Sequence, residues 1–240
     1  MSARGGSVGT LAEVSVKAVR PDRPRPSAPP RSATRSTVPA AVTAFCLDQL
    51  VRRNLRGVWV RGELPAGPAI WAANHHSWWD FFVARAAVRS IGRTDIGVLM
   101  DPANIGSRRM FGWAGAVGTD RLRAALDVLR SGGVLVLFPE GELRAPGPLG
   151  PVRPGAAWLA HRGRRPTRAV VTRVVLRGHQ APEAYLDISP VPVVAELAAV
   201  LASRIEAVDA ELAGADPSHP VPGYRPVVKG VRSWSERMSR

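Results

Sequence analysis

The sequence contains few of the features that mark secreted or membrane-spanning proteins. Its single cysteine, Cys46, excludes an internal disulfide, and no cysteine–histidine spacing is typical of a structural zinc site. No stretch reaches the roughly 18 apolar residues that a membrane-spanning helix requires, and the N-terminus lacks the apolar segment of a signal peptide. We therefore expect a protein that resides in a reducing compartment and, if it binds a membrane, lies on the membrane surface without spanning it.

Acidic residues are scarce beside basic ones. The 240 residues include 33 lysines and arginines against 19 aspartates and glutamates, a formal net charge of +14. Residues 1–40 carry seven basic and two acidic residues, so residues 41–240 keep about +9. Such a charge suits nucleic acid, an acidic membrane or a phosphate-rich substrate. A nucleic-acid-binding protein would explain the charge, although no RNA-recognition or helix-turn-helix signature is present.

The composition divides the chain into three parts. Residues 1–39 are rich in proline and arginine and are predicted to form a disordered basic tail. Residues 40–215 are predicted to form the folded domain, because the chain's 45% apolar residues are enough for a sizeable core. Residues 216–240 are expected to form a C-terminal loop and a basic segment.

Strand and helix patterns alternate along the folded part. An amphipathic helix is predicted over 41–56, where Val42, Phe45, Cys46 and Leu50 stand at helical spacing. The runs 57–62 and 69–74 are predicted to pair as a β-hairpin because a Pro/Gly turn separates them. Further strands are expected at 95–100, 134–138, 169–176 and 184–189, and further helices at 78–90, 121–130, 154–162 and 194–212. This alternation predicts an α/β fold with a mixed, largely parallel central sheet flanked by helices.

The segment NHHSWWD (74–80) lies between a predicted strand and a predicted helix. Ser77 is expected to cap the helix, so that Asp80, at its third position, can turn its carboxylate back toward the loop. There the carboxylate could hold one ring nitrogen of His75 and leave the other facing a cleft, as a general base requires. His76 is expected to point elsewhere and to tolerate replacement.

The sequence offers no partner nucleophile for such a base, since it has no Gly-x-Ser-x-Gly elbow. The base would therefore act on a hydroxyl or a water molecule brought by the substrate, which means transfer to an alcohol or hydrolysis by a thioesterase-like enzyme. A metal site of His75, His76 and Asp80 is a weaker alternative, because adjacent loop histidines rarely converge on one ion.

A second charged segment, FPEGELR (138–144), follows a buried strand. Pro139 and Gly141 constrain its backbone, and Glu140 and Arg144 are placed at the carboxyl edge of the sheet, where ligands bind in open α/β folds. The alternative is an ordinary turn with solvated charges.

Four segments in this order resemble a known family. NHHSWWD is similar to the Asn-His-x-x-x-x-Asp block of the glycerolipid acyltransferase superfamily, and FPEGELR, roughly sixty residues later, to its Phe-Pro-Glu-Gly-Thr-Arg block. Between them GWAGAVGTDR (112–121) resembles a Gly-rich block ending in arginine, and VRPGAAWLA (152–160) resembles a basic-Pro-Gly segment. The resemblance covers roughly residues 57–190, and the nearest members by length are bacterial 1-acylglycerol-3-phosphate O-acyltransferases.

The resemblance implies a reaction and a set of site residues. His75 would take the proton of an acceptor hydroxyl as it attacks an acyl thioester, and Asp80 would orient the ring. The residues expected to bind the acceptor are Arg121, Glu140, Gly141 and Arg144. The acyl donor would be acyl-CoA or acyl carrier protein, with no metal or other cofactor, and the acceptor a lysophospholipid, lysophosphatidic acid first. Such an enzyme would lie on the anionic cytoplasmic face of the cell membrane and would bind no nucleic acid.

Two departures from the family pattern bear on the acceptor. Glu142 stands where the family usually has threonine, and Arg144 comes one residue later than the family's arginine. The family also has an apolar strand that contains a proline. Its counterpart here is AVVTRVVL (169–176), which has Thr172 and Arg173 near the position of the expected proline. A glycolipid or glycosylated isoprenoid is therefore an alternative acceptor.

Three tryptophans are candidates for membrane contact. Trp78, Trp79 and Trp113, together with the helix 41–56, could lie at a lipid interface, since the basic surface favours an anionic membrane. The alternative is that the three side chains belong to the core.

Overall fold

The computed structural model describes residues 38–107 and 109–238. The predicted basic tail over 1–39 therefore lies outside the described residues, apart from its last two positions.

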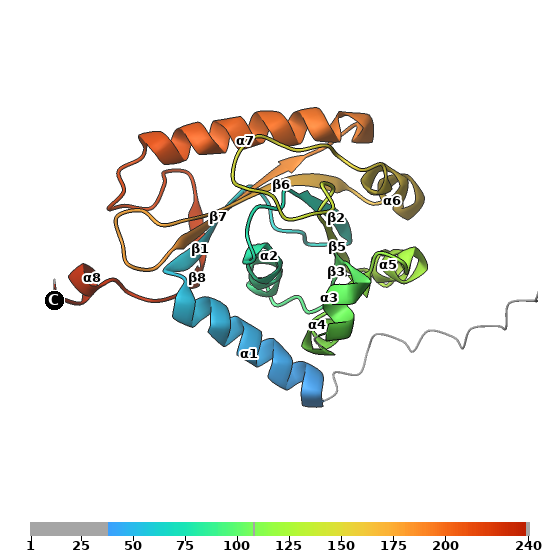
Figure 1. Ribbon diagram of the computed structural model, residues 1–240, viewed down its shortest axis with the longest axis horizontal. Coiled ribbons are helices and arrows are strands. Elements are labelled where there is room, and N and C mark those ends of the chain that lie inside the picture. The colour runs from blue at the N-terminus through green and yellow to red at the C-terminus, as the bar shows by residue number, and fades with distance from the viewer. Residues whose placement is uncertain (1–37, 108, 239–240) are drawn as a thin grey trace, which may run out of the picture. The chain divides into compact units, whose positions relative to one another are not determined.

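The described residues form one sheet of eight strands in the order β4-β3-β5-β2-β6-β7-β1-β8 (Figure 1). The strands are β1 (Gly57–Arg61), β2 (Ala69–Ala73), β3 (Ile96–Met100), β4 (Ala116–Gly118), β5 (Val134–Leu137), β6 (Thr167–Val175), β7 (Glu183–Pro190) and β8 (Arg225–Lys229). The first five in spatial order are mutually parallel, β7 and β1 are parallel to each other, and the pairs β6–β7 and β1–β8 are antiparallel. The predicted mixed, largely parallel sheet of an α/β fold is confirmed.

Helices cover both faces of this sheet (Figure 1). They are α1 (Val38–Asn54), α2 (Asp80–Arg89), α3 (Pro102–Ser107), α4 (Arg109–Trp113), α5 (Leu122–Arg130), α6 (Gly155–Gly163), the 3₁₀ helix η1 (Val194–Glu196), α7 (Leu197–Gly214) and α8 (Trp234–Met238). One core is shared by the sheet with α1, α2 and α4, and a second by the sheet with α5, α6 and α7. Within β2, Trp71 joins the first core and Ile70 the second, since successive side chains of a strand face opposite ways.

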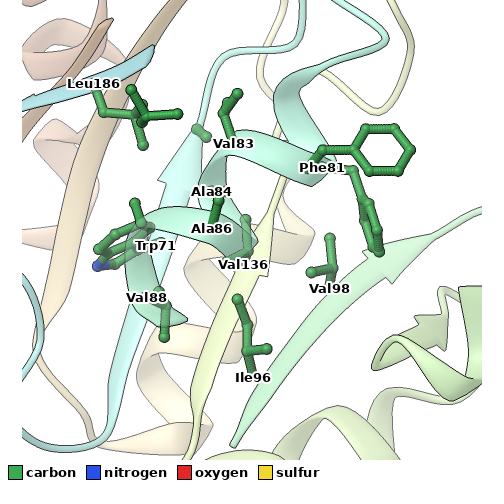
Figure 2. Packing of buried hydrophobic residues seen from close by; sticks show 14 of the residues in the cluster. Trp71, Phe81, Val83, Ala84, Ala86, Val88, Ile96, Val98, Val136 and Leu186 are labelled. Carbon is green, nitrogen blue, oxygen red and sulfur yellow. The ribbon is translucent and has the colours of Figure 1, made fainter. Parts of the chain in front are cut away.

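Helix α2 is fixed against the sheet by close packing. Figure 2 shows Trp71 beside α2, near the labelled Ala84 and Ala86, with Val136 on the neighbouring strand. The Trp71 side chain is fully buried, and the small alanines let the helix approach it closely. Because burial of one large apolar side chain contributes about 1.5–3 kcal/mol, this packing helps to hold α2 against the sheet.

The predicted β-hairpin over 57–62 and 69–74 is wrong. Strand β1 lies between β7 and β8, whereas β2 lies between β5 and β6. All five residues of β2 are buried, so the strand needs neighbours on both edges and helices on both faces. That requirement places it inside the parallel part of the sheet and away from β1.

The C-terminal segment predicted as a loop contains two elements. Strand β8 pairs antiparallel with β1 at the end of the sheet, and the short helix α8 follows it. Pro226 in β8 cannot donate a ladder hydrogen bond, which fits a strand at the sheet edge.

Helix α1 buries a different face from the predicted one. The side chains of Leu47, Val51 and Leu55 are buried at helical spacing, whereas Val42 and Phe45 are 55% and 63% exposed. The predicted apolar positions near the start of the helix therefore face away from the core.

Candidate active site

The segments NHHSWWD and FPEGELR meet at one edge of the sheet. His75 follows the carboxyl end of β2 by two residues, and Glu140 follows β5 by three. Strands β2 and β5 are parallel neighbours, so both segments leave the sheet on the same side. The topology thus places the two predicted site segments next to each other.

Asp80 is the first residue of α2 and has no solvent exposure. Its Oδ2 accepts hydrogen bonds of 2.9 Å from His75 Nδ1 and from the backbone amides of His76 and Ser77, and its Oδ1 accepts one of 2.9 Å from Thr172 Oγ1. Four donors and the positive end of the helix thus stabilise the ionised carboxylate inside the protein.

The start of α2 differs from the predicted one. Trp79, and not Ser77, occupies the N-cap position, so Asp80 is the first and not the third helical residue. The Ser77 hydroxyl instead accepts a hydrogen bond of 3.2 Å from the Trp79 amide. The Asp80 carboxylate instead holds the loop before the helix, through the amides of His76 and Ser77.

His75 combines an anchored ring with one unoccupied nitrogen. Its Nδ1 contacts the Asp80 carboxylate, and its ring stacks on Phe138 with 4.2 Å between centroids. A quarter of the side chain is exposed, and within the described residues Nε2 has no protein partner. Because an ionised carboxylate only accepts, Nδ1 carries the proton, and Nε2 presents a lone pair to solvent. This arrangement can take a proton from a bound hydroxyl.

The FPEGELR segment is fastened to the backbone of His75 on both sides. One oxygen of Glu140 accepts a 2.9 Å hydrogen bond from the His75 amide, and the other accepts one of 2.9 Å from the Gly150 amide. The amide of Arg144 donates to the His75 carbonyl oxygen at 2.9 Å. Glu140 is therefore a positioning residue with both oxygens engaged, and Gly141 turns the chain beside it with φ +71°.

Comparison with known proteins identifies the family of the chain and relatives of its fold. Residues 57–175 match the family model described as Acyltransferase. The chain belongs to the glycerolipid acyltransferase superfamily. Its fold is similar to the crystal structure of the 1-acyl-sn-glycerophosphate (LPA) acyltransferase, PlsC, from Thermotoga maritima, with a TM-score of 0.52 and 19% identity over 73% of this chain and 79% of that one. No curated protein matches the chain.

The two arginines predicted to bind the acceptor occupy different surroundings in this acyltransferase. Arg144 forms an ion pair with Glu142, and its Nε lies 3.9 Å from Glu140 Oε1. Arg121 is exposed at the start of α5, after β4, and the strands β3 and β5 separate β4 from β2. Within the described part of the chain, no hydrogen bond or ion pair joins Arg121 to His75 or Asp80. The structure therefore brings Arg144, and not Arg121, into contact with the other predicted site residues.

Sequence reasoning gave no role in the acyltransferase site to Asn74 and Thr172. The Thr172 amide donates to Asn74 Oδ1 at 2.8 Å, and Asn74 Nδ2 donates to the Thr172 carbonyl oxygen at 3.3 Å. Both residues are buried, and Thr172 also contacts Asp80. A threonine inside the apolar run 169–176 is a signal for a buried polar partner, but the partner's identity depends on β6 pairing with β2.

The surroundings of His76 argue against the expectation that it tolerates replacement. Its side chain points away from His75 as predicted, but it is only 5% exposed. Its Nε2 accepts a 3.3 Å hydrogen bond from the Val174 amide, and its Nδ1 lies 3.2 Å from Asn74 Nδ2. Burial lowers the pKa of His76, so the ring stays neutral beside Asp80. Removal of the ring would leave a cavity and an unpaired amide.

No group of three or more histidine, cysteine, aspartate or glutamate side chains in the described ranges is arranged to hold a metal ion. The Asp80 oxygens, which a metal site of His75, His76 and Asp80 would use, accept hydrogen bonds from protein donors.

The tryptophans considered for membrane contact divide into two groups. Trp78 and Trp113 are each 50% exposed, whereas Trp79 is partly buried against the core of α1, α2 and α4. None of the helices in residues 38–107 and 109–238 is long and apolar enough to cross a membrane.

Proposed function

We propose that this acyltransferase moves a fatty acyl group from a thioester donor, acyl-CoA or acyl carrier protein, to a hydroxyl of a lysolipid by general-base catalysis. The observation that supports it best is the His75 ring, whose Nδ1 is held by the buried carboxylate of Asp80 while Nε2 is free of protein partners. Such a ring could take a proton from an acceptor hydroxyl, which supports the proposal.

The chemical step follows from the state of each group. His75 Nε2 takes the proton of the acceptor hydroxyl as its oxygen attacks the thioester carbonyl carbon. The buried carboxylate of Asp80 stabilises the imidazolium that forms. Collapse of the tetrahedral intermediate breaks the carbon–sulfur bond, and the imidazolium returns the proton to the departing thiolate. No covalent enzyme intermediate is needed.

Lysophosphatidic acid is the leading acceptor. The ion pair of Glu142 with Arg144 favours a second candidate, an acceptor without a phosphate such as a glycolipid or a glycosylated isoprenoid, because it places a negative charge at the expected phosphate site.

We also propose that the protein works on the anionic inner surface of the cell membrane. The net charge of +14 suits acidic lipids, and the half-exposed Trp78 and Trp113 suit the interfacial layer. Sedimentation with liposomes should show binding that increases with the fraction of anionic lipid. Binding that is independent of this fraction would contradict the electrostatic part of the proposal.

The activity is tested with purified protein, long-chain acyl-CoA or acyl carrier protein, and a panel of lysolipids, with products identified by mass spectrometry. We expect an acylated lysolipid whose formation requires the acceptor. Release of free CoA without an acceptor would indicate a thioesterase instead. Salt-sensitive DNA binding without any acyl transfer would favour a nucleic-acid-binding protein.

A further inference from the structure

Two arginines lie at the FPEGELR turn, Arg144 within the turn and Arg153 packed over its Gly141, and their contacts differ. Arg144 lies between two carboxylates, because Glu142 forms an ion pair with it and Glu140 Oε1 lies 3.9 Å from its Nε. The charge of the Arg144 guanidinium is therefore already compensated, and an incoming anion would have to displace Glu142 to bind it.

Arg153 occupies the other side of the same turn. Its side chain lies over Gly141, where a Cβ would come within 2.4 Å of the Arg153 Nε and 2.7 Å of its Cζ. Its amide donates to the Pro139 carbonyl oxygen at 2.8 Å, which fixes its backbone to the start of the turn. Arg153 is exposed, and no carboxylate of residues 38–107 or 109–238 pairs with it.

Arg153 is linked to the proposed base, His75, through Gly141 and Glu140 of the turn. Gly141 adjoins Glu140, whose carboxylate holds the amide of His75. In a 1-acylglycerol phosphate, one carbon and one oxygen separate the phosphorus from the carbon that carries the free hydroxyl. The anion site must therefore lie close to the base, which favours Arg153 over the exposed Arg121 on the far side of β3 and β5.

We propose that Arg153 binds the anionic phosphate of the acceptor and that Glu142 keeps Arg144 from this role. The planar guanidinium suits a phosphate oxygen pair, and the missing side chain at Gly141 provides the space in which the guanidinium lies. The inference rests on the proposed acyl transfer to a lysolipid, and it assigns the group that selects a phosphate-bearing acceptor.

Kinetics on two acceptors test this assignment. Lysophosphatidic acid and monoacylglycerol share the acyl glycerol and differ in the phosphate. We expect Arg153→Gln to raise the KM for lysophosphatidic acid about 10- to 100-fold, the factor for loss of a hydrogen bond to a charged group, with a much smaller change for monoacylglycerol. Arg153→Lys should lie between the two, because lysine keeps the charge and loses the bidentate geometry.

Three further variants complete the comparison. Arg165→Gln is the matched control, since Arg165 is exposed just before β6, at the opposite edge of the sheet, and its loss removes the same charge. It should leave both KM values within about threefold, given that distant surface charges are screened. Arg144→Gln should raise the KM for lysophosphatidic acid less than Arg153→Gln does, and Glu142→Gln should lower it.

The results that would overturn the role of Arg153 differ from the results that would overturn the proposed acyl transfer. A larger effect of Arg144→Gln than of Arg153→Gln, or equal effects on the two acceptors, would overturn it. If no acceptor is acylated at all, the proposed function fails, and calorimetric titration with sn-glycerol 3-phosphate then decides the binding role. Binding by the wild-type protein that is lost in Arg153→Gln and kept in Arg165→Gln would support the site, and any other pattern would refute it.

Discussion

Replacement of Thr172 by valine tests the hydrogen-bond network that holds the Asp80 carboxylate. The Thr172 hydroxyl donates to Asp80 Oδ1 at 2.9 Å, and neither residue has any solvent exposure. Valine keeps the shape of the side chain and removes only the donor. Because a hydrogen bond to a charged group contributes about 1.5–3 kcal/mol, we expect the free energy of unfolding to fall by about that amount. The activity should fall as well, since Asp80 loses one of the four bonds that orient it.

The same strand provides a matched control. Thr167 is also buried in β6, but its Oγ1 has no hydrogen-bond partner among the described residues. Thr167→Val therefore removes a buried hydroxyl without breaking a bond, and it should leave the stability unchanged or slightly raised. Urea unfolding at pH 7.5 measures both variants against the wild-type protein. For a chain of this size, about 1.5–3 kcal/mol corresponds to a fall in Tm of about 3–12 °C.

The comparison of the two threonines is decisive. Equal losses for Thr172→Val and Thr167→Val would refute the reasoning, because they would show that the bond to Asp80 adds nothing beyond the burial of a hydroxyl.

Two further predictions concern the groups around His75. Glu140→Gln leaves one acceptor oxygen for two backbone amides, so it should lower the free energy of unfolding by about 1–3 kcal/mol in urea. The control Glu142→Gln breaks only a half-exposed pair with Arg144 and should cost about 0–1 kcal/mol. Burial lowers the pKa of His76 below its unfolded value, so the unfolded chain binds the proton more readily, and stability should fall as pH drops below about 6.5. His76→Asn should show a smaller loss between pH 7.5 and 5.5 than the exposed-site control His161→Asn.

Each of these predictions has a contradicting result. Equal losses for the two glutamate variants would show that the bonds to the backbone amides are unimportant. A fall in stability with pH that is identical in the two histidine variants would remove His76 as its source.

Sequence patterns predicted the fold where the signal was local. The alternation of strands and helices gave the α/β class, and the spacing of His75 and Asp80 gave a pair that the structure joins by a hydrogen bond. The hairpin prediction was wrong because the place of a strand in the sheet depends on how much of the strand must be buried, and strands adjacent in the sequence need not pair. The run of five buried residues in β2 required a central place that adjacency in the sequence did not provide.

The parts of the site that escaped prediction depend on distant segments. Thr172 reaches Asp80 only because β6 lies beside β2, 92 residues along the chain from the carboxylate. Glu140 accepts hydrogen bonds from two backbone amides. Every residue except proline has such an amide, so the sequence does not indicate which amides a carboxylate will bind. The buried place of His76 follows from the same strand pairing, through the Val174 amide.

The rate of acyl transfer by His75→Ala tests the central claim most directly. The variant is compared with wild-type protein and with His161→Ala, an exposed histidine on α6, using long-chain acyl-CoA and lysophosphatidic acid. Thermal unfolding of each variant checks that it is folded. We predict that kcat falls about 10²–10⁴-fold in His75→Ala and stays near the wild-type value in His161→Ala. A folded His75→Ala protein that transfers acyl groups at the wild-type rate would contradict the account.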